Sequence, residues 1–384
     1  MNMRDRTSSL KSLAKNLPGQ VVLVLQGGGA LGSYQAGVYQ ALHDAGIEPD
    51  WIIGTSIGAI NPSLIAGNSI DHRLPRLKEF WKRMEQNPVW NIRTAFPGFN
   101  ERLAYWATIT HGIPGFFRPN ALAHAGDSYP LDAERAGYYS TVPLEKTLSE
   151  LIDVDLLNSC TPRLTVATAH VRTSQMRYFD SRDGELTLKH IMASGALPPA
   201  FPAVRIDGEL YWDGGILSNT PTEVVFDDNP RKNSLIFAVH LWNPAGLEPT
   251  TMAEVLNRHK DVQYSSRIMS HIARQQHAHR LRHIINELAK RLPDSERNTP
   301  EVRALVGYGC QTRMHVVRLL APQLDRETHT KDIDFSPRGI MQRWDAGYSH
   351  TRAALQHAPW AGEIDPLSGV ILHEQTELMP VAAE

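Results

Sequence analysis

Ser56 is the residue of this sequence best placed to act as a nucleophile. It follows Gly54 by two residues and precedes Gly58 by two. Residues 51–53 are apolar and a helical pattern begins at Ile57, so the serine sits on the strand-to-helix turn of a nucleophile elbow, G-x-S-x-G. Side chains at the two glycines would crowd this turn, and the helix would point its first N–H groups toward developing negative charge. A glycine-rich turn with a helix-capping serine would use the same residues.

A second glycine-rich stretch, residues 26–32, follows an apolar run and precedes a helical pattern. Gly27, Gly29 and Gly32 fit the dinucleotide fingerprint G-x-G-x-x-G. A nucleotide-binding module would then need an acidic residue at the end of the second strand to bind a ribose. The serine turn stands at that position instead, and Asp50 comes before the strand.

The same glycines can form an oxyanion hole, and we favour this interpretation. Consecutive glycines let main-chain N–H groups point at a substrate oxygen without side chains in the way. The two strands should be neighbours in one sheet, which would place the loop beside Ser56. The expected members of the hole are Gly27, Gly28, Gly29 and Gly32.

Asp213 is the candidate base for the serine. A serine must lose its proton before it attacks, usually to a histidine, but no histidine here stands in a short motif of that kind. Asp213 follows a predicted strand, and Gly214 and Gly215 would let the chain pass close to a neighbouring loop or substrate. Alone, Asp-Gly-Gly is more typical of a simple turn. A carboxylate is a weak base toward a hydroxyl, so we expect Asp213 to lie where water is scarce.

The elements around these residues predict an α/β fold. An alternation of strand, helix, strand and helix over residues 21–66 implies a parallel sheet with right-handed crossovers. Further strands are expected at 163–171, 176–180, 204–206, 209–212, 234–241 and 313–320, and further helices at 71–84, 143–157, 186–196, 250–292 and 337–357. We therefore expect a three-layer α/β/α scaffold with a mainly parallel central sheet.

Residues 87–130 interrupt this alternation with aromatic residues and prolines that follow no regular period. The aromatic residues are Trp90, Phe96, Phe99, Tyr105, Trp106, Phe116, Phe117 and Tyr129. Such an insertion can be a lid or an apolar substrate wall. An irregular surface covering with aromatic anchors in the core would explain it equally well.

The helical pattern at residues 250–292 is basic and amphipathic. Its apolar stripe is Leu281, Ile284, Ile285, Leu288 and Leu292. A helix of this kind can lie on an anionic membrane, but we expect its apolar face to dock on the domain. His279 and His283 lie one turn apart without a third ligand nearby, which favours solvated histidines over a metal site.

Together, residues 26–32, 54–58 and 213–215 resemble the patatin-like phospholipase family. The order matches: a glycine-rich oxyanion loop after the first strand, a nucleophile elbow after the second, and Asp-Gly-Gly much later. Residues 194–202 also resemble the family's proline-bearing segment before the catalytic aspartate. The family often carries Lys or Arg at the position of Leu31, so no cationic help to the oxyanion is implied here.

The resemblance implies a serine lipid acyl hydrolase (EC 3.1.1.-) that cleaves carboxylic esters of lipids or phospholipids through a Ser–Asp dyad. Asp213 would accept the proton of Ser56, the serine would attack the ester carbonyl, and N–H groups of Gly28, Gly29 and Ile57 would hold the oxyanion. Water would then hydrolyse the acyl-enzyme. The family includes phospholipases, lysophospholipases and triacylglycerol lipases, so the substrate within this class stays open. A non-catalytic interaction protein on the same fold is a further alternative.

The 384 residues have room for one large core or for one core plus an appended region. We expect a flexible N-terminal segment (1–20), a catalytic domain (21–226), a C-terminal extension packed on it (227–360) and a tail (361–384). The extension resembles one carried by a bacterial subset of patatin-like proteins, and its helical pattern predicts a helical region to which we assign no chemistry.

Composition is that of an ordinary soluble protein, with 42% hydrophobic and 21% charged residues and a net charge of -2, which gives no indication of nucleic-acid binding. Cys160 and Cys310 form neither a zinc spacing nor a disulfide framework. No stretch approaches the length of a membrane-spanning helix. We expect a cytoplasmic enzyme without cofactor or metal, whose lipid ester substrate could bring it to a membrane surface, and we leave open whether it forms a homo-oligomer.

Overall fold

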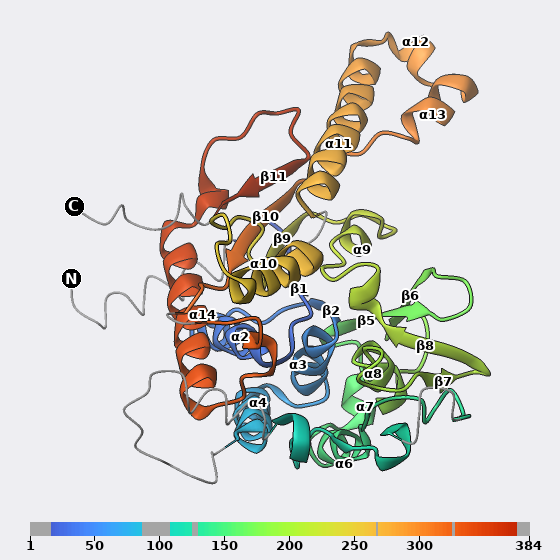
Figure 1. Cartoon of the computed structure of the whole chain (residues 1–384). Helices are drawn as coiled ribbons and strands as arrows, with labels where there is room; N and C mark the ends of the chain where they lie inside the picture. Colours follow the sequence, from blue (N-terminus) through green and yellow to red (C-terminus); the bar gives the residue numbers. More distant parts are fainter. Residues whose placement is uncertain (1–16, 87–107, 125–129, 266–267, 325–326, 375–384) are drawn as a thin grey trace, which may run out of the picture.

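A mixed sheet forms the centre of the computed structural model, which describes residues 17–86, 108–124, 130–265, 268–324 and 327–374. The strand order is β11-β10-β9-β1-β2-β5-β8-β7, and β6 also pairs with β5 (Figure 1). The strands are β1 (Gln20–Leu25), β2 (Trp51–Thr55), β5 (Arg163–His170), β6 (Met176–Asp180), β7 (Val204–Ile206), β8 (Glu209–Asp213), β9 (Ser234–His240), β10 (Met314–Leu320) and β11 (Val370–His373). All neighbours from β11 to β5 run parallel, whereas β6, β7 and β8 pair antiparallel. The predicted mainly parallel sheet is confirmed.

Helices cover both faces of this sheet (Figure 1). Side chains in β1 alternate between the two faces, as the period of a strand requires. Val21, Leu23 and Leu25 pack into the core beneath α2 (Ser33–Asp44), α3 (Ile57–Ala66) and α14 (Pro337–His357). Val22 and Val24 pack into a second core beneath α9 (Glu223–Phe226) and α11 (Ile268–Arg291). The predicted three-layer α/β/α arrangement is therefore confirmed.

Two glycines bring α14 close to α2. A Cβ atom on Gly37 would lie 1.9 Å from the carbonyl oxygen of Trp344, and one on Gly347 would lie 2.0 Å from that of Tyr34. The two helix backbones are therefore in direct contact. The last long helix of the chain is consequently part of the layer that covers β1 and β2.

The remaining elements are short or lie at the periphery. They are α4 (Ile70–Met84), α6 (Val142–Leu151), α7 (Val154–Leu157), α8 (Leu188–Ser194), α10 (Met252–Ser265), α12 (Asp294–Arg297), α13 (Pro300–Val306), the two-residue strands β3 (Arg118–Pro119) and β4 (Tyr139–Ser140), and the 3-10 helices η1 (Gly29–Gly32), η2 (Ala121–His124), η3 (Gly214–Ile216), η4 (Lys331–Ile333) and η5 (Pro359–Ala361). The C-terminal end of α11 projects from the body of the molecule together with α12 and α13 (Figure 1). None of the helices in the described ranges is both long enough and apolar enough to cross a bilayer.

The helix predicted at residues 143–157 is two helices, α6 and α7. The break occurs at Asp153, whose carboxylate accepts hydrogen bonds from the N–H groups of Asp155 and Leu156. An aspartate in this role caps the start of a new helix. The pattern at residues 250–292 corresponds to α10 and α11, with residues 266–267 outside the described ranges.

The prediction for the apolar stripe of α11 is correct only in part, because Ile284, Ile285 and Leu292 are half-buried and the other two members are exposed. Leu281 and Leu288 are 48% and 59% exposed, whereas the buried face carries Ile272, His279 and His283. His283 Nε2 lies 3.0 Å from the carbonyl oxygen of Thr312, so a polar contact helps to set the rotation of the helix. The two histidines are accordingly buried rather than solvated.

Strands β9, β10 and β11 continue the sheet that contains β1 and β2. Strand β9 lies between β1 and β10 and pairs with β1 over residues 20–25. The region beyond residue 226 thus contributes both strands and helices to the same layers. The domain division expected from the sequence stays a prediction.

Candidate active site

Ser56 sits on a strained turn between β2 and α3. Its φ is 57° and its ψ is -127°, a backbone region that a residue with a side chain adopts only when its surroundings enforce it. A Cβ on Gly54 would lie 1.5 Å from the carbonyl oxygen of Gly58, and one on Gly58 would lie 2.2 Å from that of Leu25. The predicted elbow geometry therefore depends on both glycines.

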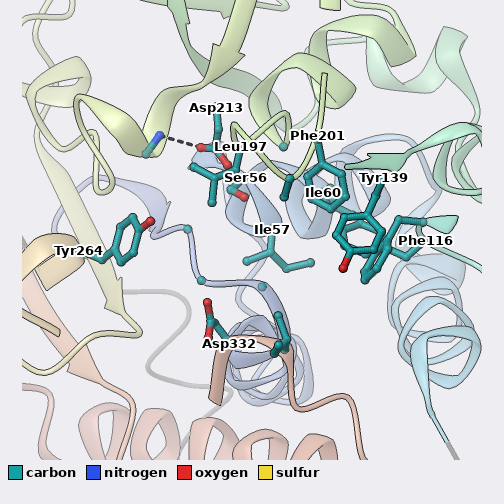
Figure 2. A pocket seen from close by; sticks show the side chains of 18 of the residues that line it. Ser56, Ile57, Ile60, Phe116, Tyr139, Leu197, Phe201, Asp213, Tyr264 and Asp332 are labelled. Atoms are coloured by element: carbon teal, nitrogen blue, oxygen red, sulfur yellow. Dashed lines mark hydrogen bonds between the residues drawn. The ribbon is translucent and has the colours of Figure 1, made fainter. Parts of the chain in front are cut away.

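Strand pairing brings the turn at Ser56 to Asp213. Ala167 of β5 pairs with Thr55 of β2 and also with a residue of β6, so β2 and β6 lie on opposite edges of β5. Thr168, the next residue of β5, pairs with β6 and with Asp213 of β8. Strand β8 therefore lies on the same edge of β5 as β2, and the two strands meet end to end. Ser56 and Asp213 occupy the junction (Figure 2).

Asp213 is a buried carboxyl group with 2% of its surface exposed. Burial raises its pKa from 3.8 to about 7, while the N–H of Gly215 and the side chain of Ser56 lower it in part. The N–H of Gly215 donates a hydrogen bond of 2.7 Å to Asp213 Oδ1. A Cβ on Gly214 would lie 2.7 Å from the carbonyl oxygen of Ala167, so a glycine lets this turn pack against β5. A carboxyl group with a pKa near 7 can exchange protons at neutral pH.

The glycine loop lies on the other side of Ser56. Among the described residues, no acceptor takes a hydrogen bond from the N–H of Gly28 or of Gly29. The N–H of Ile57, the first residue of α3, is likewise without an acceptor in the described part of the chain. All three residues line the cavity at Ser56, so their N–H groups are the candidates for binding a negatively charged oxygen.

Two of the glycines predicted for the oxyanion hole, Gly27 and Gly32, do not offer a free N–H group to the cavity. The N–H of Gly27 donates to the carbonyl oxygen of Asn219 at 3.2 Å, although Gly27 does line the cavity. Gly32 does not line the cavity, and a Cβ there would lie 2.4 Å from Cγ1 of Ile57. Gly32 thus gives room to Ile57 next to the elbow instead of facing the cavity.

Asp50 precedes β2 in the chain, whereas a ribose-binding acid would follow that strand. Its carboxylate accepts a hydrogen bond of 2.8 Å from the N–H of Val21.

A cavity of about 240 Å³ opens beside Ser56 and has two different ends. One end is aromatic and apolar, with Phe116, Tyr139 and Phe201 on one side of Ser56 (Figure 2). The other end carries polar groups, with Tyr264 and Asp332 on the far side of the glycine loop (Figure 2). Thr108, Ile109, Phe117 and Phe335 are further members of the wall.

The described part of the insertion has features of both alternatives, because Phe117 belongs to the core, Phe116 packs against that core, and both line the cavity. Phe116 and Phe117 line the cavity, and their rings contact that of Phe201 at centroid distances of 6.0 and 5.5 Å. The other aromatic residues of the insertion lie outside the described residues: Trp90, Phe96, Phe99, Tyr105, Trp106 and Tyr129. The lid and the surface covering therefore stay alternatives.

Several residues of the site were not predicted from the sequence. Gln26 is fully buried, and its amide contacts Thr220, Leu241 and Trp242, which ties β1 to the end of β9. Asn219 Nδ2 donates to the carbonyl oxygen of Gly27 at 3.1 Å. Gln26 follows β1 directly, as Ser56 follows β2, and polar residues at the carboxyl ends of parallel strands are a signal for a site. Asn219 has no such signal because it follows no strand.

Neither a histidine nor a metal cluster accompanies this arrangement in the described residues. The cavity lining there contains no histidine, and no three His, Cys, Asp or Glu side chains gather as metal ligands would. Leu31, which stands where the resembled family often carries Lys or Arg, is buried in the core. In the described residues, the ionisable group next to Ser56 is therefore the Asp213 carboxyl group.

Comparison with protein families gives two matches. Residues 23–226, a little over half of the chain, match the family described as patatin-like phospholipase. Residues 262–367 match a second family described as patatin phospholipase. The first match contains Ser56, the glycine loop and Asp213, and the second contains Tyr264 and Asp332.

Individual relatives are similar to parts of the chain. Lysophospholipase nte1 of Aspergillus terreus is 28% identical over 271 residues, which is 64% of this chain and 15% of that protein. Patatin-like phospholipase domain-containing protein 7 of Rattus norvegicus is 49% identical over 222 residues, 57% of this chain and 14% of that protein. The chain thus corresponds to a small part of the length of these relatives. Among solved structures, VipD from Legionella pneumophila aligns over 88% of this chain and 67% of its own, with 16% identity and a TM-score of 0.37.

Proposed function

The chain belongs to the patatin-like phospholipase family, and from that premise we propose that it is a serine hydrolase that cleaves acyl esters of lipids with Ser56 as nucleophile and Asp213 as base. The observation that carries the proposal is the junction of β2 and β8, which places the elbow serine beside a buried carboxyl group. Three residues whose N–H groups have no acceptor in the described part of the chain line the same cavity.

Acylation begins with the ionised form of Asp213. Its carboxylate takes the hydroxyl proton of Ser56 while the serine oxygen forms a bond to the ester carbonyl carbon. The carbonyl π electrons move to oxygen, and the N–H groups of Gly28, Gly29 and Ile57 stabilise this oxyanion. Each such donor typically contributes about a hundredfold to a thousandfold in rate. A pKa near 7 makes Asp213 a stronger base than an exposed carboxylate, because burial disfavours its charge.

The tetrahedral intermediate then collapses. The carbonyl re-forms, the bond to the alcohol oxygen breaks, and Asp213 returns its proton to the leaving alkoxide. In deacylation a water molecule gives its proton to Asp213 and its oxygen to the acyl carbon. Collapse of the second intermediate releases the carboxylic acid, and the proton on Asp213 returns to Ser56. One carboxyl group thus serves in turn as base and acid.

The shape of the cavity supports an acyl chain at its aromatic end. Phe116, Tyr139 and Phe201 form an apolar wall next to Ser56, while the polar end beyond the glycine loop suits the alcohol part of the ester. The substrate class that this arrangement supports is an ester whose acyl chain binds along the aromatic wall. The name of the fungal relative, a lysophospholipase, agrees with this class. A substrate drawn from a membrane surface stays a prediction.

The experiment that tests the proposal compares the wild type with Ser56→Ala. Both proteins are incubated with a fluorophosphonate probe and with p-nitrophenyl esters, and we expect labelling and turnover only in the wild type. Ser149→Ala is the matched control, because Ser149 is exposed on α6 and its hydroxyl only donates to the carbonyl oxygen of Lys146. Labelling or turnover that survives Ser56→Ala would show that another residue is the nucleophile.

A further inference from the structure

We infer that the C-terminal region positions the oxyanion loop through a clamp of two ion pairs between α10 and η4. The clamp consists of Lys260 with Asp332 and of Asp261 with Lys331. None of the four residues is part of the match at residues 23–226 that contains the nucleophile. The inference rests on the proposed function, since it assigns Lys260, Asp261 and Lys331 as positioning residues for the same reaction.

Helix η4 is in direct contact with the glycine loop. A Cβ on Gly29 would lie 2.2 Å from the carbonyl oxygen of Asp332, so the η4 backbone lies directly against Gly29. Gly29 has a φ of +55°, a conformation that glycine adopts easily and other residues rarely. Figure 2 shows Asp332 beside the glycine loop, on the side away from Asp213. The position of η4 therefore limits where Gly29 and its N–H can lie.

Two ion pairs attach η4 to α10. Lys331 Nζ lies 2.7 Å from Asp261 Oδ1, and the two side chains are 3% and 2% exposed. Lys260 Nζ lies 2.7 and 2.8 Å from the two carboxylate oxygens of Asp332. Both elements carry the order Lys-Asp, and the pairs cross. A slip by one residue in one direction would bring the two lysines together, and a slip in the other direction would bring the two aspartates together, so the charges favour a single register.

Hydrogen bonds also attach α10 to Gly27, the first glycine of the loop. The carbonyl oxygen of Tyr264, in the last turn of α10, accepts hydrogen bonds of 3.1 Å from Gln26 and from Asn219. Asn219 also donates to the carbonyl oxygen of Gly27 at 3.1 Å. Helix α10 thus connects to Gly27 through Asn219 and to Gly29 through η4. Both ends of the segment that presents the N–H groups are held by the same helix.

Loss of the two ion pairs should affect stabilisation of the transition state more than binding of the substrate. An N–H group that moves away from the oxyanion loses most of its contribution, whereas the ground-state ester makes a weaker hydrogen bond there. Loss of the buried pair of Lys331 with Asp261, neither of which lines the cavity, should therefore lower kcat and leave KM nearly unchanged. The base Asp213 lies on the other side of Ser56, so its pKa, and with it the acid limb of the pH–rate profile, should not move.

The test compares Lys331→Met with the wild type, both as the full chain. We expect kcat to fall by about tenfold or more, approaching the cost of one oxyanion donor, with KM within about threefold and an unchanged midpoint of the acid limb. Lys331→Arg keeps the charge and should recover most of kcat. Lys290→Met is the matched control, because Lys290 makes an exposed ion pair with Glu287 on α11 and should keep wild-type kcat.

A buried, unpaired Asp261 could prevent Lys331→Met from folding, and circular dichroism with thermal melting will report this. Lys260→Met then carries the test, because its pair with Asp332 is partly exposed and folding should survive. A folded variant of either lysine with wild-type kcat overturns the inference. So does an acid limb that moves toward lower pH, since the clamp would then exclude water from Asp213 instead of positioning the loop.

Failure of the inference and failure of the proposed function give different results. If Ser56→Ala retains turnover, the proposed function fails, whatever the lysine variants do. If Ser56→Ala is inactive and folded Lys331→Met or Lys260→Met is fully active, the inference alone fails.

Discussion

The hydroxyl of Ser194 accepts a hydrogen bond of 2.9 Å from the backbone N–H of Ser56. The same hydroxyl donates to the carbonyl oxygen of Ala167 at 2.7 Å, and Ser194 is completely buried. One side chain on α8 therefore links the strained elbow to β5. The N–H of Ser56 is thereby occupied, which leaves the N–H of Ile57 as the group after the nucleophile that can face a substrate.

We expect Ser194→Ala to lower both stability and activity. It leaves the Ser56 N–H and the Ala167 carbonyl without their buried partner, which costs about 1–3 kcal/mol in the free energy of unfolding. The elbow also loses its attachment to β5, so kcat should fall by about tenfold or more. Urea unfolding and ester kinetics measure the two effects. Wild-type kcat in a folded Ser194→Ala protein would show that the elbow holds its geometry without this bond.

The pH dependence of the rate should have an acid limb with a midpoint near pH 7. Asp213 must be ionised to accept a proton, and burial raises its pKa to about 7, so activity is lost as pH falls through that value. The measurement is kcat/KM for a p-nitrophenyl ester from pH 5 to pH 9 at constant ionic strength. A rate that stays flat down to about pH 5 would mean that the base is an ordinary exposed carboxylate or a different group.

Asp213→Asn should separate the activity of this residue from its effect on stability. We expect turnover to fall by at least about a thousandfold, because the amide cannot accept the serine proton. The folded pKa of Asp213 is raised above its ordinary value of 3.8, so its contribution to stability is present at low pH and is lost as pH rises through about 7. The variant should therefore gain stability relative to the wild type between about pH 4 and pH 7. Chemical denaturation at several pH values tests this, and a parallel pH dependence of the two proteins would contradict it.

Gly54→Ala tests the packing of the elbow without changing a polar group. The added methyl group would lie 1.5 Å from the carbonyl oxygen of Gly58, so β2 and α3 would have to move apart. We expect a loss of at least about 4 kcal/mol or no folded protein, since overlap with backbone cannot be relieved by a side-chain rotation. Gly184→Ala is the control, because a Cβ there has open space around it. Thermal melting of the two variants should differ clearly, and equal melting temperatures would contradict the elbow geometry.

Phe201→Ala should alter the preference for acyl-chain length. Phe201 contacts the rings of Phe116, Phe117 and Tyr139 in the apolar wall. Each buried methylene contributes about 0.8 kcal/mol, so loss of this wall should lower kcat/KM for a long-chain ester by about tenfold and affect an acetate ester little. Tyr308→Ala is the control, because Tyr308 is 74% exposed. If both ester lengths lose activity equally, the aromatic end is not the acyl site.

Local patterns were sufficient to predict the elements that contain the site. The strand at residues 21–25, the glycine loop, the helix at residues 57–66 and the hairpin ending at Asp213 all follow from the spacing of apolar residues and glycines, and the structure has them at these places. The positions of Ser56 and Asp213 relative to each other did not follow from such patterns. They depend on β2 and β8 sharing one edge of β5. Pairing between strands that are far apart in the chain cannot be recognised from a short stretch of sequence.

The residues that the C-terminal region contributes to the cavity also could not be predicted from the sequence. Tyr264 and Asp332 lie far along the chain from the glycine loop, and nothing in their neighbourhood marks them as part of a cavity. The stripe on α11 misled in part, for a related reason. Apolar spacing predicts that one face of a helix is buried, but contacts of His279 and His283 with the rest of the molecule decided which face it is.

The insertion of β9 beside β1 has a consequence for how the chain completes its fold during synthesis. Strand β1 is made first and can pair with β2 soon afterwards, but its other edge stays open until residues 234–240 emerge. Until then the nascent protein exposes an apolar edge that can pair with another chain. A protein shortened after residue 226 would keep Ser56 and Asp213, yet it would keep this open edge permanently. We expect such a fragment to aggregate, whereas one that retains β9 and β10 would close the edge of β1.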